Sequence, residues 1–113
     1  MDGILVKDKR LFERIATNLA LRFMDLDGNK VGQGQACDVS AKGVGFISSE
    51  PLKPSTSLGI WLDIPDGSSD LYTQGSVAWS RPLVDGRYRI GVELMRPELM
   101  GFSRVLRLNQ NFA

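Results

Sequence analysis

Two short groups of polar side chains have the types and spacing to bind a ligand. Asp38, Ser40 and Gly43 are arranged as Asp-x-Ser-x-x-Gly, and the period of two along a strand places Asp38 and Ser40 on one face. Because glycine lacks a Cβ, another group can approach the backbone closely at Gly43. Upstream, Arg10 and Arg14 form Arg-x-x-x-Arg, and each guanidinium offers a planar fork of donors suited to a phosphate or to the acceptor edge of a guanine. These residues predict a small polar recognition edge.

Both groups also have a simpler explanation. Arg10 and Arg14 could form an i, i+4 pair on a solvated helical turn, with Glu13 as a local counter-charge. Asp38 and Ser40 could cap loose amides in a tight turn, with the glycine in the left-handed conformation. The explanations are compatible, since a tight turn can itself present polar groups to a ligand.

The two motifs, in this order and about this far apart, resemble the PilZ domain, the bacterial receptor module for cyclic di-GMP. The resemblance covers nearly the whole chain, because residues 75–79 and 88–94 are similar to the last two barrel strands of the family. It implies a closed barrel with an arm that folds over it, so that both motifs meet on cyclic di-GMP. It also implies a stand-alone receptor domain whose output passes to another protein. The ligand-binding residues implied are Arg10, Arg14, Asp38, Ser40 and Gly43.

Six runs with strand-like alternation support a barrel independently. They cover about residues 17–24, 32–39, 43–48, 58–64, 71–80 and 87–95. Their expected inward side chains include Leu21, Phe46, Ile60, Val77 and Trp79. Three Asp-Gly pairs predict turns with positive φ, the first at 27–28. With no helix between the runs they predict an antiparallel meander, and closure into a barrel would hide its edges.

The predicted fold is therefore all-β: a small six-stranded antiparallel β-barrel with a flexible N-terminal arm and a C-terminal α-helix. The arm is expected at residues 1–16, which are rich in charge and lack a clear period. The barrel and its helix are expected at 17–113 as a single domain. The helix should begin at Pro97 and pack on the barrel through Leu99, Phe102 and Leu106, which share a helical stripe.

Composition narrows the possible functions. The chain has 113 residues, a formal net charge of +1, one cysteine and no histidine. The near-neutral charge argues against a general polyanion binder, so an anion site must be local. Because Cys37 is the single cysteine, no intrachain disulfide can form, which favours a reducing compartment. Cys37 is expected to be a buried or half-buried strand residue and not a reactive thiol. With neither a signal peptide nor an apolar run long enough to insert into a membrane, the protein is expected in the cytoplasm.

The favoured function is a receptor for cyclic di-GMP that signals to a downstream protein partner. One alternative is a PilZ-like protein-interaction adaptor that binds no nucleotide. Another is a barrel that binds single-stranded nucleic acid through Arg10, Arg14, Arg22 and an exposed Trp61, but such sites need several aromatic platforms in a basic groove. An enzyme is the least favoured class. The chain has no histidine, the commonest general base and metal ligand, and no pair of carboxylates stands out. No catalytic residue, cofactor or metal site is expected.

Overall fold

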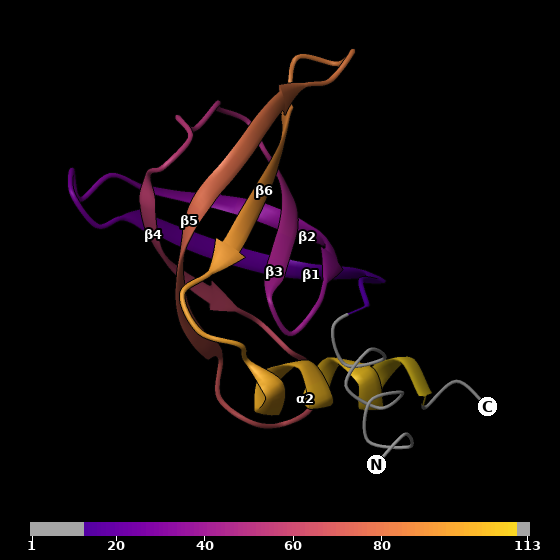
Figure 1. Cartoon of the computed structure of the whole chain (residues 1–113). Coiled ribbons are helices and arrows are strands. Elements are labelled where there is room, and N and C mark those ends of the chain that lie inside the picture. Colours follow the sequence, from indigo (N-terminus) through magenta and orange to yellow (C-terminus); the bar gives the residue numbers. More distant parts are fainter. Residues whose placement is uncertain (1–12, 111–113) are drawn as a thin grey trace.

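Six antiparallel strands form a closed barrel in the order β1-β2-β3-β6-β5-β4, and one helix follows them in the described part of the chain (Figure 1). The computed structural model describes residues 13–110; residues 1–12 and 111–113 lie outside this description. The prediction of a six-stranded antiparallel barrel with a C-terminal helix is confirmed. The elements are β1 (Ile15–Asp25), β2 (Val31–Val39), β3 (Gly43–Ser48), β4 (Ser57–Leu62), β5 (Leu71–Pro82), β6 (Tyr88–Leu94) and α2 (Leu99–Gln110).

Alternation along the strands fills the barrel interior. In β1, Leu19, Leu21 and Phe23 are buried, whereas the intervening Ala20 and Arg22 are exposed. Each fully buried aliphatic or aromatic side chain contributes about 1.5–3 kcal/mol relative to an exposed one, so these inward positions dominate the stability of the barrel. The other strands supply the remaining inward side chains, among them Val39, Val44, Phe46, Leu58, Ile60, Leu62, Val77, Ile90 and Val92.

Helix α2 lies below the strands in the view of Figure 1 and packs on the barrel through two of the three predicted residues, Phe102 and Leu106. Phe102 and Val105 are fully buried and belong to the barrel core, and Leu106 packs against it. The helix begins at Leu99, two residues after Pro97. The expectation that Leu99 is buried was wrong, because the helix turns its Phe102 and Val105 positions inward and leaves Leu99 45% exposed. No helix among the described residues has the length and apolar character to cross a membrane.

An ion pair attaches α2 to the loop between β4 and β5. Arg104 Nε donates to Asp66 Oδ2 at 2.7 Å, and its Nη2 donates to Oδ1 at 2.9 Å and to the Ser69 carbonyl at 2.8 Å. This is the two-pronged geometry in which a guanidinium binds a carboxylate most specifically. The hydrogen bonds from Arg104 hold the pKa of the Asp66 carboxyl well below its usual range.

The turns agree in part with the predicted Asp-Gly turns. Gly67 and Gly86 have φ angles of 84° and 85°, the left-handed region that glycine enters without strain. In the first hairpin the positive φ belongs to Asn29, at 59°, and not to the predicted pair at 27–28. There the Asp25 carboxylate accepts hydrogen bonds from the amides of Asp27 and Gly28, which moves the left-handed residue to the end of the turn.

Candidate functional site

The loop between β2 and β3 is a tight turn that Ser40 closes. The Ser40 amide donates to the Gly43 carbonyl at 2.9 Å. The Ser40 hydroxyl oxygen accepts from the amides of Lys42 and Gly43 at 3.2 and 3.1 Å. Ser40 is only 4% exposed and lies beyond the end of β2, so its hydroxyl is turned into the loop. The turn therefore uses Ser40 as a cap, but Gly43 is not among the residues with positive φ and begins β3 in an extended conformation.

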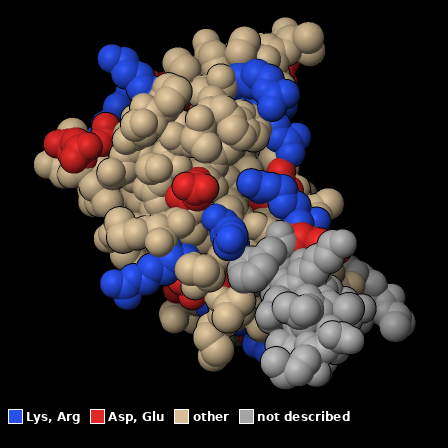
Figure 2. Space-filling view, in the orientation of Figure 1, with Lys and Arg blue, Asp and Glu red and all other residues tan. Residues whose placement is uncertain are grey.

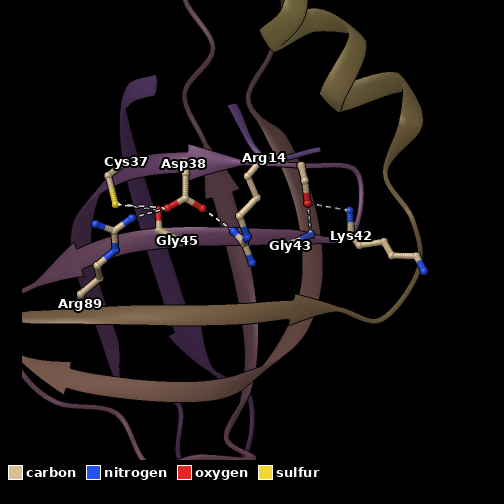
Figure 3. A network of polar contacts seen from close by, with 8 residues as sticks. Arg14, Cys37, Asp38, Lys42, Gly43, Gly45 and Arg89 are labelled. Carbon is tan, nitrogen blue, oxygen red and sulfur yellow. Dashed lines mark hydrogen bonds and ion pairs between the residues drawn. The ribbon is translucent and has the colours of Figure 1, made fainter. Parts of the chain in front are cut away.

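Asp38 binds two guanidinium groups from distant parts of the chain (Figure 3). Its Oδ1 accepts a hydrogen bond from Arg14 Nη1, and its Oδ2 accepts one from Arg89 Nη2 at 2.5 Å. The Asp38 side chain is 15% exposed, whereas those of Arg14 and Arg89 are 48% and 42% exposed. Arg14 directly precedes β1, so this ion pair joins the first motif of the sequence to the second.

The site is built on one row of residues that runs across four strands. Asp38 in β2 lies opposite Gly45 in β3, Gly45 opposite Gly91 in β6, and Gly91 opposite Trp79 in β5. A Cβ at Gly45 would lie 2.6 Å from Asp38 Oδ2, and one at Gly91 would lie 2.2 Å from the Trp79 ring. The two glycines thus give space to the side chains at the ends of the row. As a result the carboxylate lies over β3 and the indole over β6.

Two β-bulges turn the ends of this row outward. The register of β2 with β3 shifts between Ala36 and Asp38, and that of β5 with β6 shifts between Val77 and Trp79. Each extra residue reverses the alternation, so Ala36 and Val77 face the core while Asp38 and Trp79 face outward. The prediction that Trp79 points inward was wrong for this reason, because strict alternation from Val77 misses the bulge at Ala78.

A pocket of about 270 Å³ opens beside the loop. Arg14, Ser40 and Gly43 contribute to its wall, so the structure brings together three of the residues expected to bind the ligand. Asp38 adjoins the pocket through its contact with Arg14 and does not line it. Arg10, the remaining expected residue, lies outside the described residues. The full lining is Arg14, Ser40, Lys42, Gly43, Ala78, Trp79, Gly91, Val92 and Glu93.

Gly43 also makes a close approach possible, as its motif suggested. A Cβ at this position would lie 2.9 Å from Arg14 Nη2 and 2.9 Å from the Val92 carbonyl oxygen. The guanidinium therefore rests directly against the backbone of the loop. A larger residue would displace Arg14 or separate β3 from β6.

Cys37 is the extra residue of the bulge in β2 and is half-buried. Its Sγ lies 3.4 Å from the Gly45 carbonyl oxygen, to which the thiol can donate. Burial raises the pKa of the Cys37 thiol, and the positive charge of Arg89 opposes that effect only in part. The thiol is therefore protonated near neutral pH, which agrees with a packing role.

Basic and acidic side chains are interspersed over the face shown in Figure 2. The recognition chemistry is accordingly local: a guanidinium, a carboxylate, a buried hydroxyl and an indole gather beside one loop. The described residues contain no cluster of His, Cys, Asp and Glu that could hold a metal ion. Fold and site together define a small closed barrel with a polar pocket on its outer surface.

The chain belongs to the PilZ domain family, whose model matches residues 8–108. PilZ domains are non-enzymatic receptor domains, so membership places the chain outside the enzymes. A search of curated protein sequences finds no match.

Several solved structures share this fold at low sequence identity. The PilZ domain of YcgR from Escherichia coli, solved with cyclic di-GMP, has a TM-score of 0.69 and 14% identity over 88% of this chain and 90% of that one. The PilZ domain of CeSA from a cellulose-synthesizing bacterium has a TM-score of 0.60 and 22% identity over 85% and 93%. The inhibitor of motility MotI/DgrA from Bacillus subtilis has a TM-score of 0.67 and 12% identity. The match covers 88% of this chain but only 51% of MotI/DgrA.

Sequence reasoning did not assign Gly45, Arg89, Gly91 or an outward Trp79 to the site. Two of them left a trace in the sequence, since Gly45 and Gly91 each lie between two apolar residues of a strand. A glycine inside a strand often marks a close approach by another group. Arg89 left no such trace, because its partner lies 51 residues away.

Proposed function

We propose that this domain is a receptor for cyclic di-GMP. The observation that carries the proposal is the contact between Arg14 and Asp38, which unites the two motifs 24 residues apart in the chain beside one pocket. A second support is the shared fold of the YcgR PilZ domain, whose structure was solved with this ligand. The ligand offers two anionic phosphodiesters and two guanine bases, and the site offers matching groups.

Arg14 is the residue that we assign to the phosphodiester or to the guanine acceptor edge. Its guanidinium lines the pocket and is 48% exposed, so it can turn from Asp38 to a ligand without crossing the core. Asp38, once released from Arg14, can accept hydrogen bonds from the guanine N–H groups. Arg10 is proposed as the second guanidinium of the arm, although it lies outside the described residues.

Ser40 is assigned a donor role toward the ligand. A hydroxyl has one proton and two acceptor lone pairs, and the Ser40 oxygen already accepts from two backbone amides. Its proton is then the group left for a ligand, and it would be donated to a phosphate oxygen or a guanine acceptor. Gly43 would keep the backbone accessible where Arg14 and the ligand meet, and the indole of Trp79 would form an apolar wall of the pocket.

Signalling is proposed to use the arm that carries Arg10 and Arg14. Phosphodiesters held between the arm and the loop would draw the arm toward the barrel, and a downstream protein could distinguish the two states. Amide hydrogen exchange over residues 5–16 tests this step. Saturating cyclic di-GMP should increase protection there, and equal protection with and without ligand would refute arm closure while leaving binding intact.

Isothermal titration calorimetry tests binding itself. Cyclic di-GMP should bind with a measurable heat, whereas GTP, the linear dinucleotide and a single-stranded oligonucleotide should bind at least about tenfold more weakly, since one lost charge-assisted contact already has that effect. Arg14→Ala is the matched site variant, and Arg107→Ala on the exposed side of α2 removes the same charge elsewhere. A silent titration at high micromolar ligand with a folded protein would overturn the proposal and favour a protein-interaction adaptor.

A further inference from the structure

Arg89 contacts the carboxylate of the candidate site without lining its pocket. Its Nη2 donates to Asp38 Oδ2 at 2.5 Å, but Arg89 is not among the residues around the cavity. In the register of β3 and β6 it lies opposite Ile47, two rows away from the pair Gly45 and Gly91 and so on the same face of the sheet. Its side chain therefore reaches across the bare backbone at Gly45 to meet Asp38, as Figure 3 shows.

The two guanidiniums on Asp38 have different freedom to leave. Arg14 lines the pocket and precedes the first strand, so a ligand phosphodiester can attract it away from Oδ1. Arg89 belongs to strand β6, whose backbone is paired on both sides, and it binds the other oxygen, Oδ2. A carboxylate has about four lone-pair positions, so Asp38 can keep Arg89 and still accept N–H groups from a base.

We infer that Arg89 is a positioning residue, which holds Asp38 over Gly45 in the orientation needed to bind guanine after Arg14 has moved to the ligand. This inference rests on the proposed function. In a protein that lacks Arg89, the Asp38 carboxylate would have no ion-pair partner among the described residues once Arg14 has moved to the ligand. It would then turn toward solvent, and part of the binding free energy would be needed to reorient it.

A double-mutant cycle tests the inference in the full chain, with cyclic di-GMP affinity as the readout. Arg89→Ala should weaken binding by about tenfold, the size of one charge-assisted hydrogen bond. Arg89→Lys keeps the charge and should recover most of that loss. The control is Arg87→Ala, which removes a nearby exposed charge that is paired with Asp85 in the hairpin. It should change affinity by less than about twofold, as expected for an exposed charge at a distance.

The cycle distinguishes positioning from direct contact. In an Asp38→Ala background, Arg89→Ala should have almost no further effect, because Arg89 acts only through that carboxylate. If Arg89→Ala weakens binding equally in both backgrounds, it contacts the ligand directly and the inference is wrong. An Arg89→Ala variant that binds like Arg87→Ala would overturn it as well.

A measurement without ligand separates this inference from the proposed function. In the wild-type protein, NMR of the guanidinium groups should show restricted rotation for Arg89, and Asp38→Ala should abolish that restriction. An Arg89 signal that does not respond to Asp38→Ala would refute the positioning role, whether or not cyclic di-GMP binds. Failure of the wild-type protein to bind cyclic di-GMP would instead refute the proposed function.

Discussion

Replacement of Gly45 by alanine should impair binding while leaving the fold almost unchanged. The added Cβ would lie 2.6 and 2.8 Å from the two carboxylate oxygens of Asp38, which is closer than real Cβ contacts. The nearest atoms belong to a short side chain held by Arg14 and Arg89, so the carboxylate must rotate away from both. The substitution therefore perturbs the orientation of Asp38 without removing any functional group.

Two opposing contributions decide the stability of the Gly45→Ala protein. Alanine in a strand is favoured over glycine by about 0.5–1 kcal/mol, because glycine loses more backbone entropy on folding. The ion pairs that are lost have arginine side chains more than a third exposed, and exposed pairs contribute only about 0–1 kcal/mol. These contributions nearly cancel, so the melting temperature of the free protein should barely change.

Ligand affinity has no such compensation. A base that can no longer donate to Asp38 loses at least one charge-assisted hydrogen bond, worth about 1.5–3 kcal/mol, and Kd should rise about tenfold to a hundredfold. Calorimetric titration with cyclic di-GMP gives this number, and thermal unfolding gives the stability. Gly59→Ala is the matched control, since its Cβ would press on the Tyr72 side chain, with the hydroxyl at 2.9 Å and a ring carbon at 3.1 Å, outside the pocket. A Gly45→Ala protein with wild-type affinity would refute the placement of Asp38 in the site.

Three further predictions separate site, core and helix attachment. Arg14→Ala should raise Kd for cyclic di-GMP about tenfold to a hundredfold and leave the melting temperature of the free protein nearly unchanged; a large loss of stability would show that Arg14 is structural. Ile90→Ala, in the barrel core, should lower the free energy of unfolding by about 2–5 kcal/mol, as measured by urea titration, and a smaller loss would mean that the core can collapse around the cavity. Arg104→Ala should lower the urea midpoint at pH 7, and because the folded-state pKa of Asp66 is depressed by Arg104, the difference from wild type should shrink as pH falls below the usual aspartate range; a difference that is constant with pH, like that expected of Arg107→Ala, would refute the assignment.

The strands could be predicted because alternation is a local property of the sequence. Leu21, Phe46 and Ile60 are buried as expected, and in each strand the residue two positions away is buried as well. The prediction failed at Trp79, where one extra residue at Ala78 reverses the alternation. A bulge is set by the pairing of two strands, and a single run of residues does not reveal where its partner lacks a matching residue.

In the candidate site, likewise, the residues that are close in the sequence could be predicted and those brought together by strand pairing could not. Asp38, Ser40 and Gly43 are close in the sequence, and the structure places them in and beside one loop. Arg89, in contrast, meets Asp38 only because β3 and β6 are neighbours in the barrel. The predicted helix stripe failed at Leu99 for a related reason. Helical spacing gives the faces of a helix, but the shape of the barrel end decides which face is buried.

The ligand-free contact between Arg14 and Asp38 bears directly on affinity, because a ligand must replace it. The Arg14 side chain is 48% exposed, so the ion pair contributes only about 0–1 kcal/mol to the stability of the free protein. A phosphodiester bound by Arg14 and a guanine bound by Asp38 would each form a charge-assisted hydrogen bond worth about 1.5–3 kcal/mol. The two ligand contacts together would therefore exceed the free energy lost when the ion pair between Arg14 and Asp38 is broken. Because Arg89 stays on Oδ2, the carboxylate need not be reoriented when Arg14 departs, and the free protein is held close to the geometry that binding requires.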